Sequence, residues 1–149
     1  MEYHSEKVKI RPFTKEDVTP RYRSWFNDSE TTRHNTHGLF PYTPEQSQAF
    51  IAALEGDRSR IIWAIELKTD ITDKYSTDFI PGTTAARRVY EWQHVGNVSL
   101  QSINLLNRSA ELAIVIGEAK ARCKGIGLQV CPILRRRLPI SRLSGVVRP

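Results

Sequence analysis

The sequence predicts an α+β fold with a mixed, mostly antiparallel sheet flanked by helices. Two observations support this fold class: the order of the hydrophobic patterns, and a glycine-containing turn that follows the last clear strand pattern. The strand patterns cover residues 7–11, 60–67, 94–100 and 110–116, and helical patterns separate the first two. Strands that follow a block of helices in this way are typical of α+β proteins. The 149 residues suit one domain with its own core.

Hydrophobic spacing defines the first strand and the helical region after it. Residues 7–11 alternate polar and apolar side chains, as a half-buried strand does, and Pro12 ends the pattern. Tyr22, Trp25 and Phe26 then fall at i, i+3 and i+4. This spacing places three aromatic rings on one helical face, and we expect them to pack in the core.

A further helix is predicted to begin at Thr43. Thr43 can cap this helix, Pro44 suits its first position, and Gln46 can complete a capping box. Gly56 is well placed to end it. The dense run of β-forming residues at 60–67 predicts a central strand after this helix.

Residues 68–93 carry no sustained hydrophobic period. They mix Thr, Asp and Ser with a Pro81-Gly82 turn and the basic pair Arg87-Arg88. The sequence therefore predicts a long loop, or a partly ordered hairpin, between the strands at 60–67 and 94–100.

The positive charge lies at one end of the chain. The net charge is +6, but residues 130–149 hold five arginines and no acidic residue. Residues 1–129 are therefore nearly neutral, with 17 basic and 16 acidic residues. This distribution does not support a nucleic-acid-binding face over the whole domain.

Other classes of protein are disfavoured by composition. No window holds the ~18 apolar residues that a membrane span needs, and the polar N-terminus does not resemble a secretory signal. A cytoplasmic location without membrane association is the expectation. Cys123 and Cys131 have no metal-ligand spacing, so we expect two unpaired thiols and no metal site.

The chemistry of the chain is expected in the turn after the last clear strand. Residues 122–128 read Arg-Cys-Lys-Gly-Ile-Gly-Leu and lead from a strand into a helix start. Free amides of the first helical turn and the helix dipole favour an anion at such a place. Gly125 and Gly127 let the backbone approach a phosphate, and Arg122 and Lys124 can add positive charge.

The loop matches neither the P-loop nor the dinucleotide-binding pattern. Its Arg-x-x-Gly-x-Gly pattern resembles the acetyl-CoA pyrophosphate loop of the GNAT superfamily of N-acetyltransferases. The resemblance extends over residues 7–129, apart from 68–93, and is nearest to members that acetylate ribosomal-protein alanine N-termini or amino sugars. The matching segments are 10–13, 25–28, 40–43, 95–100 and 109–118.

The resemblance implies acetyl-CoA as co-substrate and two sets of contacts with it. The backbone of Ile114, Val115 and Ile116 would pair with the pantetheine arm as an added strand does. The pyrophosphate would be held by the amides of Cys123, Lys124, Gly125, Ile126 and Gly127, together with the charge of Arg122. The acceptor would be a primary amine on a protein N-terminus, an amino sugar or a small molecule.

Glu111 is the candidate general base, because the acceptor amine must lose a proton before it attacks the thioester. The other interpretation of Glu111, an exposed or paired carboxylate, stays open. Glu118 is a second candidate, and His34 and His37 lie in the region expected to shape the acceptor site.

After residue 129 the family pattern is lost. Pro132 falls inside the expected helix, and the Arg- and Pro-containing segment 130–149 predicts an atypical tail in place of the fifth strand. We therefore expect a chain that is truncated or frameshifted near residue 129, with a sheet incomplete after its fourth strand. A weaker alternative makes 143–147 a substitute fifth strand.

An incomplete sheet would have consequences for function. An open edge at the fourth strand would favour pairing with a second copy, as a homodimer. Cofactor binding and turnover would be weak. The alternative to an enzyme is then a degenerate domain that binds acyl-CoA or a protein partner.

Overall fold

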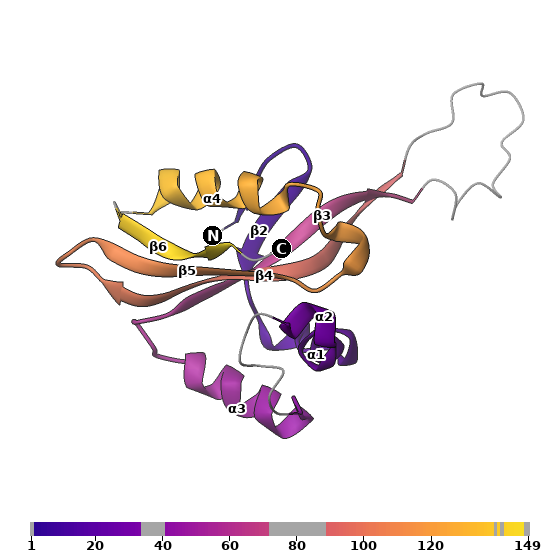
Figure 1. Cartoon of the computed structure of the whole chain (residues 1–149), viewed down its shortest axis with the longest axis horizontal. Helices are drawn as coiled ribbons and strands as arrows, with labels where there is room; N and C mark the ends of the chain where they lie inside the picture. Colours follow the sequence, from indigo (N-terminus) through magenta and orange to yellow (C-terminus); the bar gives the residue numbers. More distant parts are fainter. Residues whose placement is uncertain (1, 34–40, 72–88, 139, 141, 148–149) are drawn as a thin grey trace, which may run out of the picture.

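A single six-stranded sheet organises the molecule. The computed structural model describes residues 2–33, 41–71, 89–138, 140 and 142–147 (Figure 1). The strands follow one another in chain order across the sheet: β1 (Tyr3–His4), β2 (Val8–Pro12), β3 (Ile61–Asp70), β4 (Tyr90–Asn104), β5 (Ser109–Ile116) and β6 (Arg142–Val147). All neighbours pair antiparallel except β5 and β6, which are parallel. The predicted α+β class with a mixed, mostly antiparallel sheet is confirmed.

Helices cover both faces of the sheet. The α-helices are α1 (Pro20–Asn27), α2 (Ser29–Thr32), α3 (Pro44–Leu54) and α4 (Ile126–Arg137), and short 3-10 turns form η1 (Lys15–Asp17) and η4 (Ala119–Ala121). Figure 1 shows α4 on one face and α1, α2 and α3 on the other. The predicted cap at Thr43 is present: its hydroxyl accepts from the Gln46 amide, and the Gln46 side chain accepts from the Thr43 amide.

The two faces carry separate apolar clusters. The larger cluster joins the sheet to α4 through side chains that are almost fully buried, among them Ile10, Ile65, Val98, Leu112, Val130 and Leu134. The smaller one consists of Tyr22, Trp25 and Phe26 on α1, with Phe13, Val18 and Tyr42 against them. The prediction that the three α1 aromatics pack in a core is confirmed, since they are 2%, 4% and 7% exposed.

A β-bulge in β4 controls where β5 ends. Ile65 pairs with Gly96 and Glu66 with His94, so the register skips Val95. The Val95 carbonyl instead accepts hydrogen bonds from the amides of Gly117 and Glu118, at 3.0 and 3.2 Å. A side chain at Gly96 would meet the Val115 carbonyl at 2.2 Å, so the close approach of the two strands requires glycine there.

Residues 68–93 were predicted to form a long loop or a partly ordered hairpin, and their described ends pair as a hairpin. Lys68, Thr69 and Asp70 pair with Trp92, Glu91 and Tyr90 as the outer part of the β3–β4 hairpin. The Lys68 ammonium lies 4.6 Å from the Tyr90 ring centre. This part of the hairpin stands away from both apolar clusters, which explains why its sequence lacks the expected alternation. Residues 72–88 lie outside the described part of the chain.

The expectation of a sheet that stops after its fourth predicted strand is also corrected. Ile126, Val130 and Leu134 form an apolar stripe at i, i+4 and i+8, and all three are buried against the sheet. Pro132 lies inside α4 on its exposed side. Burial of the stripe offsets the lost amide, so the helix continues and 142–147 pairs with β5. The apolar periodicity that the sequence pattern was missing after residue 129 is therefore present in α4, and the structure gives no support to a frameshift.

We expect Pro132→Ala to raise the free energy of unfolding by about 1–3 kcal/mol, because it restores an amide donor to the Leu128 carbonyl. Urea denaturation of the two proteins measures the difference. Leu134→Ala, which empties a fully buried site on the same helix, should lower it by about 2–5 kcal/mol. A destabilised Pro132→Ala protein would show that the helix needs the bend that proline imposes.

A charged network ties β2 to β3 and to η1 on the face opposite α4. The Arg11 guanidinium donates to both carboxylate oxygens of Asp17, at 2.6 and 2.8 Å, and to Glu66 at 2.8 Å. Lys9 pairs with the second oxygen of Glu66 at 2.8 Å. Burial alone raises the pKa of Asp17, but the hydrogen bonds from Arg11 and the Thr14 amide outweigh it and lower the pKa.

A lowered pKa in the folded state makes Asp17 a source of acid sensitivity. Its contribution is fully present above the pKa of the unfolded chain, about 4, and is lost as pH falls through the lower folded value. We expect Asp17→Asn to lower the free energy of unfolding at pH 7 by about 1.5–3 kcal/mol and to flatten the decline below pH 4. Denaturation from pH 7 to pH 2.5 tests this, with the exposed Glu91→Gln as control. An unchanged acid limb in Asp17→Asn would contradict the assignment.

Candidate functional site

A pocket of about 190 Å³ lies where β5 leads into α4. Eight of the nine residues predicted to bind the cofactor line it, and Val115 is the exception, because its side chain faces the other side of the sheet. The lining residues are Ile114, Ile116, Ala121, Arg122, Cys123, Lys124, Gly125, Ile126, Gly127 and Leu128. The structure thus brings together a strand edge, a glycine-containing loop and a helix start.

The loop takes its shape from two left-handed residues. Cys123 has φ 58° and Gly125 has φ 67°. Gly125 is the N-cap of α4 and gives no side-chain hydrogen bond to the first turn. No atom lies within 4 Å of the place where a Cβ of Gly125 would stand, so the backbone is open on that side. The first-turn amides of α4 are therefore available to an anion.

β5 runs past the end of its parallel partner. The register of β6 reaches the pair Ile114–Val147, whereas β5 continues to Ile116. Among the described residues, the edge of Val115 and Ile116 is thus beyond the last β6 pair. An extended ligand could add to the sheet at this place, as a further strand does.

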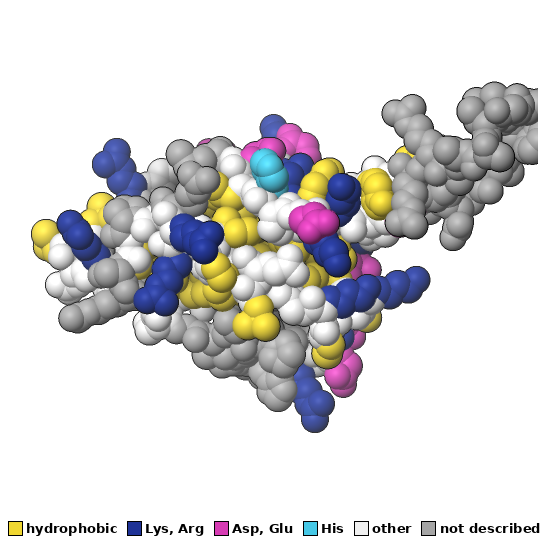
Figure 2. All heavy atoms as spheres, turned by 90° about the horizontal axis from the view of Figure 1, so that it is seen from above, with side chains coloured by type: hydrophobic (Ala, Val, Ile, Leu, Met, Phe, Trp, Pro, Cys, Tyr) yellow, Lys and Arg dark blue, Asp and Glu magenta, His cyan; other side chains and the backbone are white. Residues whose placement is uncertain are grey.

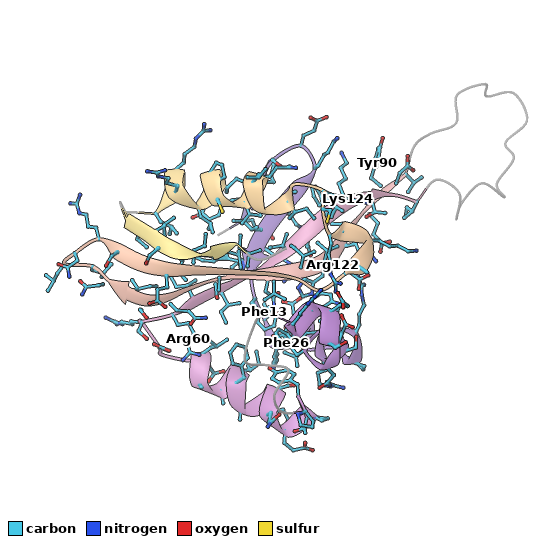
Figure 3. All side chains as sticks on the ribbon, in the orientation of Figure 1. Phe13, Phe26, Arg60, Tyr90, Arg122 and Lys124 are labelled. Carbon is cyan, nitrogen blue, oxygen red and sulfur yellow. The ribbon has the colours of Figure 1, made fainter. Side chains whose placement is uncertain are left out.

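The Arg122 side chain lines the pocket and also binds groups on the α1–α2 side of the sheet. Its Nη2 donates to Thr31 Oγ1 at 2.6 Å, to the Gly117 carbonyl at 3.1 Å and to Asp28 Oδ2 at 3.2 Å. Its Nε donates to the Ile116 carbonyl at 3.2 Å. Figure 3 shows Arg122 directed to the α1–α2 side of the sheet, and Lys124 near α4. Lys124 is exposed, so its ammonium is the loop charge better placed for an anion.

Glu118, the second candidate base, is held in an ion pair. Its Oε1 accepts from Arg21 Nε at 2.6 Å and from Trp25 Nε1 at 3.1 Å. Burial alone raises the pKa of Glu118, but these two hydrogen bonds outweigh it and lower the pKa. A carboxylate so stabilised in its charged form is a weak proton acceptor.

Glu111 is exposed near the start of β5, paired in register with Gln101 of β4 and Ser144 of β6. It alternates with the buried Leu112, so it faces the side of the sheet that carries α1, α2 and α3. The structure leaves the proposed base role of Glu111 as a prediction. His34 and His37 lie outside the described residues.

Sequence reasoning missed four residues around the site. Ala121 and Leu128 line the pocket, and Leu128 is 80% exposed despite its apolar side chain. A leucine directly after the Gly-x-Gly turn is a sequence signal that could have identified Leu128 as a pocket residue. Asp28 and Thr31 bind Arg122 across 94 and 91 residues of sequence, and no local pattern predicts such a contact.

The distribution of charge on the surface and the length of the helices show whether the protein has features of other kinds of binding site. Figure 2, a view onto the α4 side, shows Lys and Arg side chains scattered among neutral and hydrophobic ones. No helix in the described ranges is long and apolar enough to cross a membrane.

Solved structures with the same fold come from several organisms. A domain from Methanocaldococcus jannaschii is 18% identical with a TM-score of 0.60, and the match covers 87% of this chain and 68% of that one. Spermidine N-acetyltransferase from Vibrio cholerae, in complex with CoA and spermine, is 16% identical with a TM-score of 0.59, covering 85% and 60%. The microcin C7 self-immunity acetyltransferase, in complex with acetyl-CoA and AMP, is 16% identical with a TM-score of 0.61, covering 89% and 62%.

These matches establish the fold, and the chain spans 60–68% of the length of the three structures. No curated protein sequence matches it. The family model for the acetyltransferase (GNAT) domain matches residues 7–138, which is most of the chain and includes the whole pocket loop. This chain therefore belongs to the GNAT acetyltransferase family.

Proposed function

We propose that this protein is an acetyl-CoA-dependent N-acetyltransferase that acetylates a primary amine. The observation that carries the proposal is the pocket at the end of β5. There the part of β5 beyond its last described β6 pair meets a left-handed loop and the N-terminus of α4. Family membership supports it, as do the CoA, acetyl-CoA and spermine named for two similar structures.

The loop fits a pyrophosphate. The amides of Cys123 to Gly127 belong to the loop and first turn at the start of α4, whose dipole favours negative charge. Open space beside Gly125 lets phosphate oxygens approach the backbone. Lys124 adds an exposed ammonium, while the Asp28 carboxylate compensates the charge of Arg122. Backbone amides thus supply the binding geometry, and one lysine supplies net charge.

The strand edge fits the pantetheine arm, whose amides can pair with Ile114, Val115 and Ile116. The Ile116 carbonyl already accepts from Arg122, and Ile114 pairs in register with Val147 of β6, so the arm would pair mainly beside Val115. Ile114 and Ile116 line the pocket and offer apolar contact to the methylene groups. The acyl end would then lie toward the middle of β5.

In the reaction, the acceptor nitrogen forms a bond to the thioester carbonyl carbon. The carbon–sulfur bond then breaks, and CoA leaves as a thiolate that takes up a proton from water. The amine must lose protons to a base or to a chain of waters. Glu111 is our candidate for this base, because it lies on β5 and faces the sheet side of α1–α3. Its exposure allows the carboxylate to exchange the proton with solvent.

We expect calorimetric titration to give a micromolar Kd for acetyl-CoA. Lys124→Ala should weaken binding about tenfold, since it removes one charge-assisted contact. Gly125→Glu should abolish measurable binding, because it forces a side chain into a left-handed position and adds negative charge. Lys120→Ala, an exposed lysine outside the pocket, is the matched control. A folded wild-type chain that does not bind acetyl-CoA would refute the proposal.

Release of free thiol in the presence of spermidine, glucosamine and an alanine-initiated peptide should identify the acceptor class. On the acceptor that reacts, Glu111→Gln should lower kcat by about 10²- to 10⁴-fold with an unchanged Kd for acetyl-CoA. The exposed Glu55→Gln serves as control. Unchanged turnover in Glu111→Gln would make Glu111 a simple surface carboxylate. Acetyl-CoA binding without transfer to any of the three amines would favour the non-enzymatic alternative.

A further inference from the structure

The segment from Gly117 to Arg122, which connects β5 to the pocket loop, is docked on the α1–α2 pair. Trp25 lies so close to Gly117 that a Cβ at this glycine would stand 2.0 Å from the indole ring. Arg21 on α1 pairs with Glu118 and also donates to the His94 carbonyl, at 3.0 Å. Arg122 makes the third contact, with α2. Three separate interactions therefore join this segment to the helices on the face opposite α4.

The Arg122 contact differs from the other two because Arg122 is itself part of the pocket lining. Its guanidinium holds the carbonyls of Ile116 and Gly117 and, with the same Nη2, the Asp28 carboxylate and the Thr31 hydroxyl. The side chain is 22% exposed, so these contacts are partly shielded from water. One side chain thus fixes the end of β5 and the loop relative to α2.

Asp28 holds the other end of this link. Its Oδ2 accepts from the Thr31 amide at 2.9 Å and from the Thr31 hydroxyl at 2.6 Å, which makes it the N-cap of α2. Hydrogen bonds from Thr31 and a further one from Arg122 lower the pKa of the Asp28 carboxyl, so the group is charged at neutral pH. The oxygen that begins α2 is therefore the one that holds Arg122.

We infer that Asp28 is a positioning residue for the acetyl-CoA loop: through Arg122 it sets the backbone of the loop without lining the pocket. The inference rests on the proposed function for its ligand. Asp28 lies on the helices opposite α4, where the acceptor amine must approach if Glu111 is the base. Binding of acetyl-CoA at the loop and order at the start of α2 are then linked, and the linkage is reciprocal.

The size of the effect follows from the geometry. The Asp28 side chain is 45% exposed, so loss of its charge changes the long-range field little. Asparagine at position 28 keeps an oxygen that can cap α2, but it loses the charge-assisted bond to Arg122, which is one of four that hold the guanidinium. The end of β5 and the loop after it are then held less firmly to α2. Residues that act at a distance in this way typically change binding by ~2- to 30-fold. We expect a 3- to 10-fold weaker Kd.

The test compares Asp28→Asn with Asp57→Asn by two measurements. Asp57 is a matched control, because it also accepts from a backbone amide and a hydroxyl, of Ser59, and pairs with an arginine, Arg60, away from the pocket. In the free proteins, hydrogen exchange of amides 122–127 should be faster in Asp28→Asn and unchanged in Asp57→Asn. In titrations, Asp28→Asn should weaken acetyl-CoA binding, and Arg122→Lys combined with it should add less than the sum of the two single effects.

A second readout separates positioning from simple loss of stability. Acetyl-CoA at saturation should slow exchange at the Thr31 and Thr32 amides of the wild type, and this protection should be reduced in Asp28→Asn. Wild-type exchange at 122–127 in a folded Asp28→Asn protein would overturn the inference, whether or not acetyl-CoA binds. Failure of the wild type to bind acetyl-CoA would refute the proposed function, and the exchange in the free proteins would still decide the role of Asp28.

Discussion

The double hydrogen bond at the Val95 carbonyl is the constraint on which the candidate site depends. The bulge that skips Val95 turns this carbonyl toward the end of β5, where it accepts from two successive amides. Two consecutive amides cannot both point to one neighbouring strand in regular β structure, so the chain must leave the sheet at Gly117. After Gly117, residues 118–125 therefore pass around the end of the sheet and lead into α4. The pocket therefore depends on the bulge of β4 at Val95.

Glycine at two positions makes this arrangement possible. Gly96 lets β5 approach the bulge, since a Cβ there would collide with the Val115 carbonyl. Gly117 accepts the face of Trp25, which brings α1 against the end of β5. The aromatic cluster of α1 and the strand that carries the pocket are thus in direct contact. A helix that looks purely structural in sequence becomes part of the support of the site.

The sequence predicted those parts of the molecule whose determinants are local. The capping box at Thr43, the aromatic face of α1 and the loop at 122–127 each depend on residues a few positions apart, and the structure contains all three elements. One prediction failed because tertiary contacts outweighed a local rule. Pro132 disfavours a helix, but burial of Val130 and Leu134 holds α4 through it. For residues 68–93 the sequence left a loop and a hairpin open, because the outer part of the hairpin lacks alternation where neither of its faces packs in a core.

β5 is the strand that contacts both the pocket side of the sheet and the side that carries α1–α3. Its even-numbered side chains pack toward α4 and the pocket, while Glu111, Ala113 and Val115 face the α1–α3 side. If acetyl-CoA lay along this edge, its pyrophosphate would lie at the loop on one side of the sheet. An amine would approach its thioester from the helices on the other side. Arg122 adds a second connection at the end of the same strand, because it binds carbonyls of the strand end and the N-cap of α2 together. In the proposed function, Arg122 positions the loop and Lys124 is the exposed loop cation that remains for an anion. If Asp28 positions the loop as we propose, the loop amides keep fixed directions toward the start of α4, where the helix N-terminus favours a phosphate.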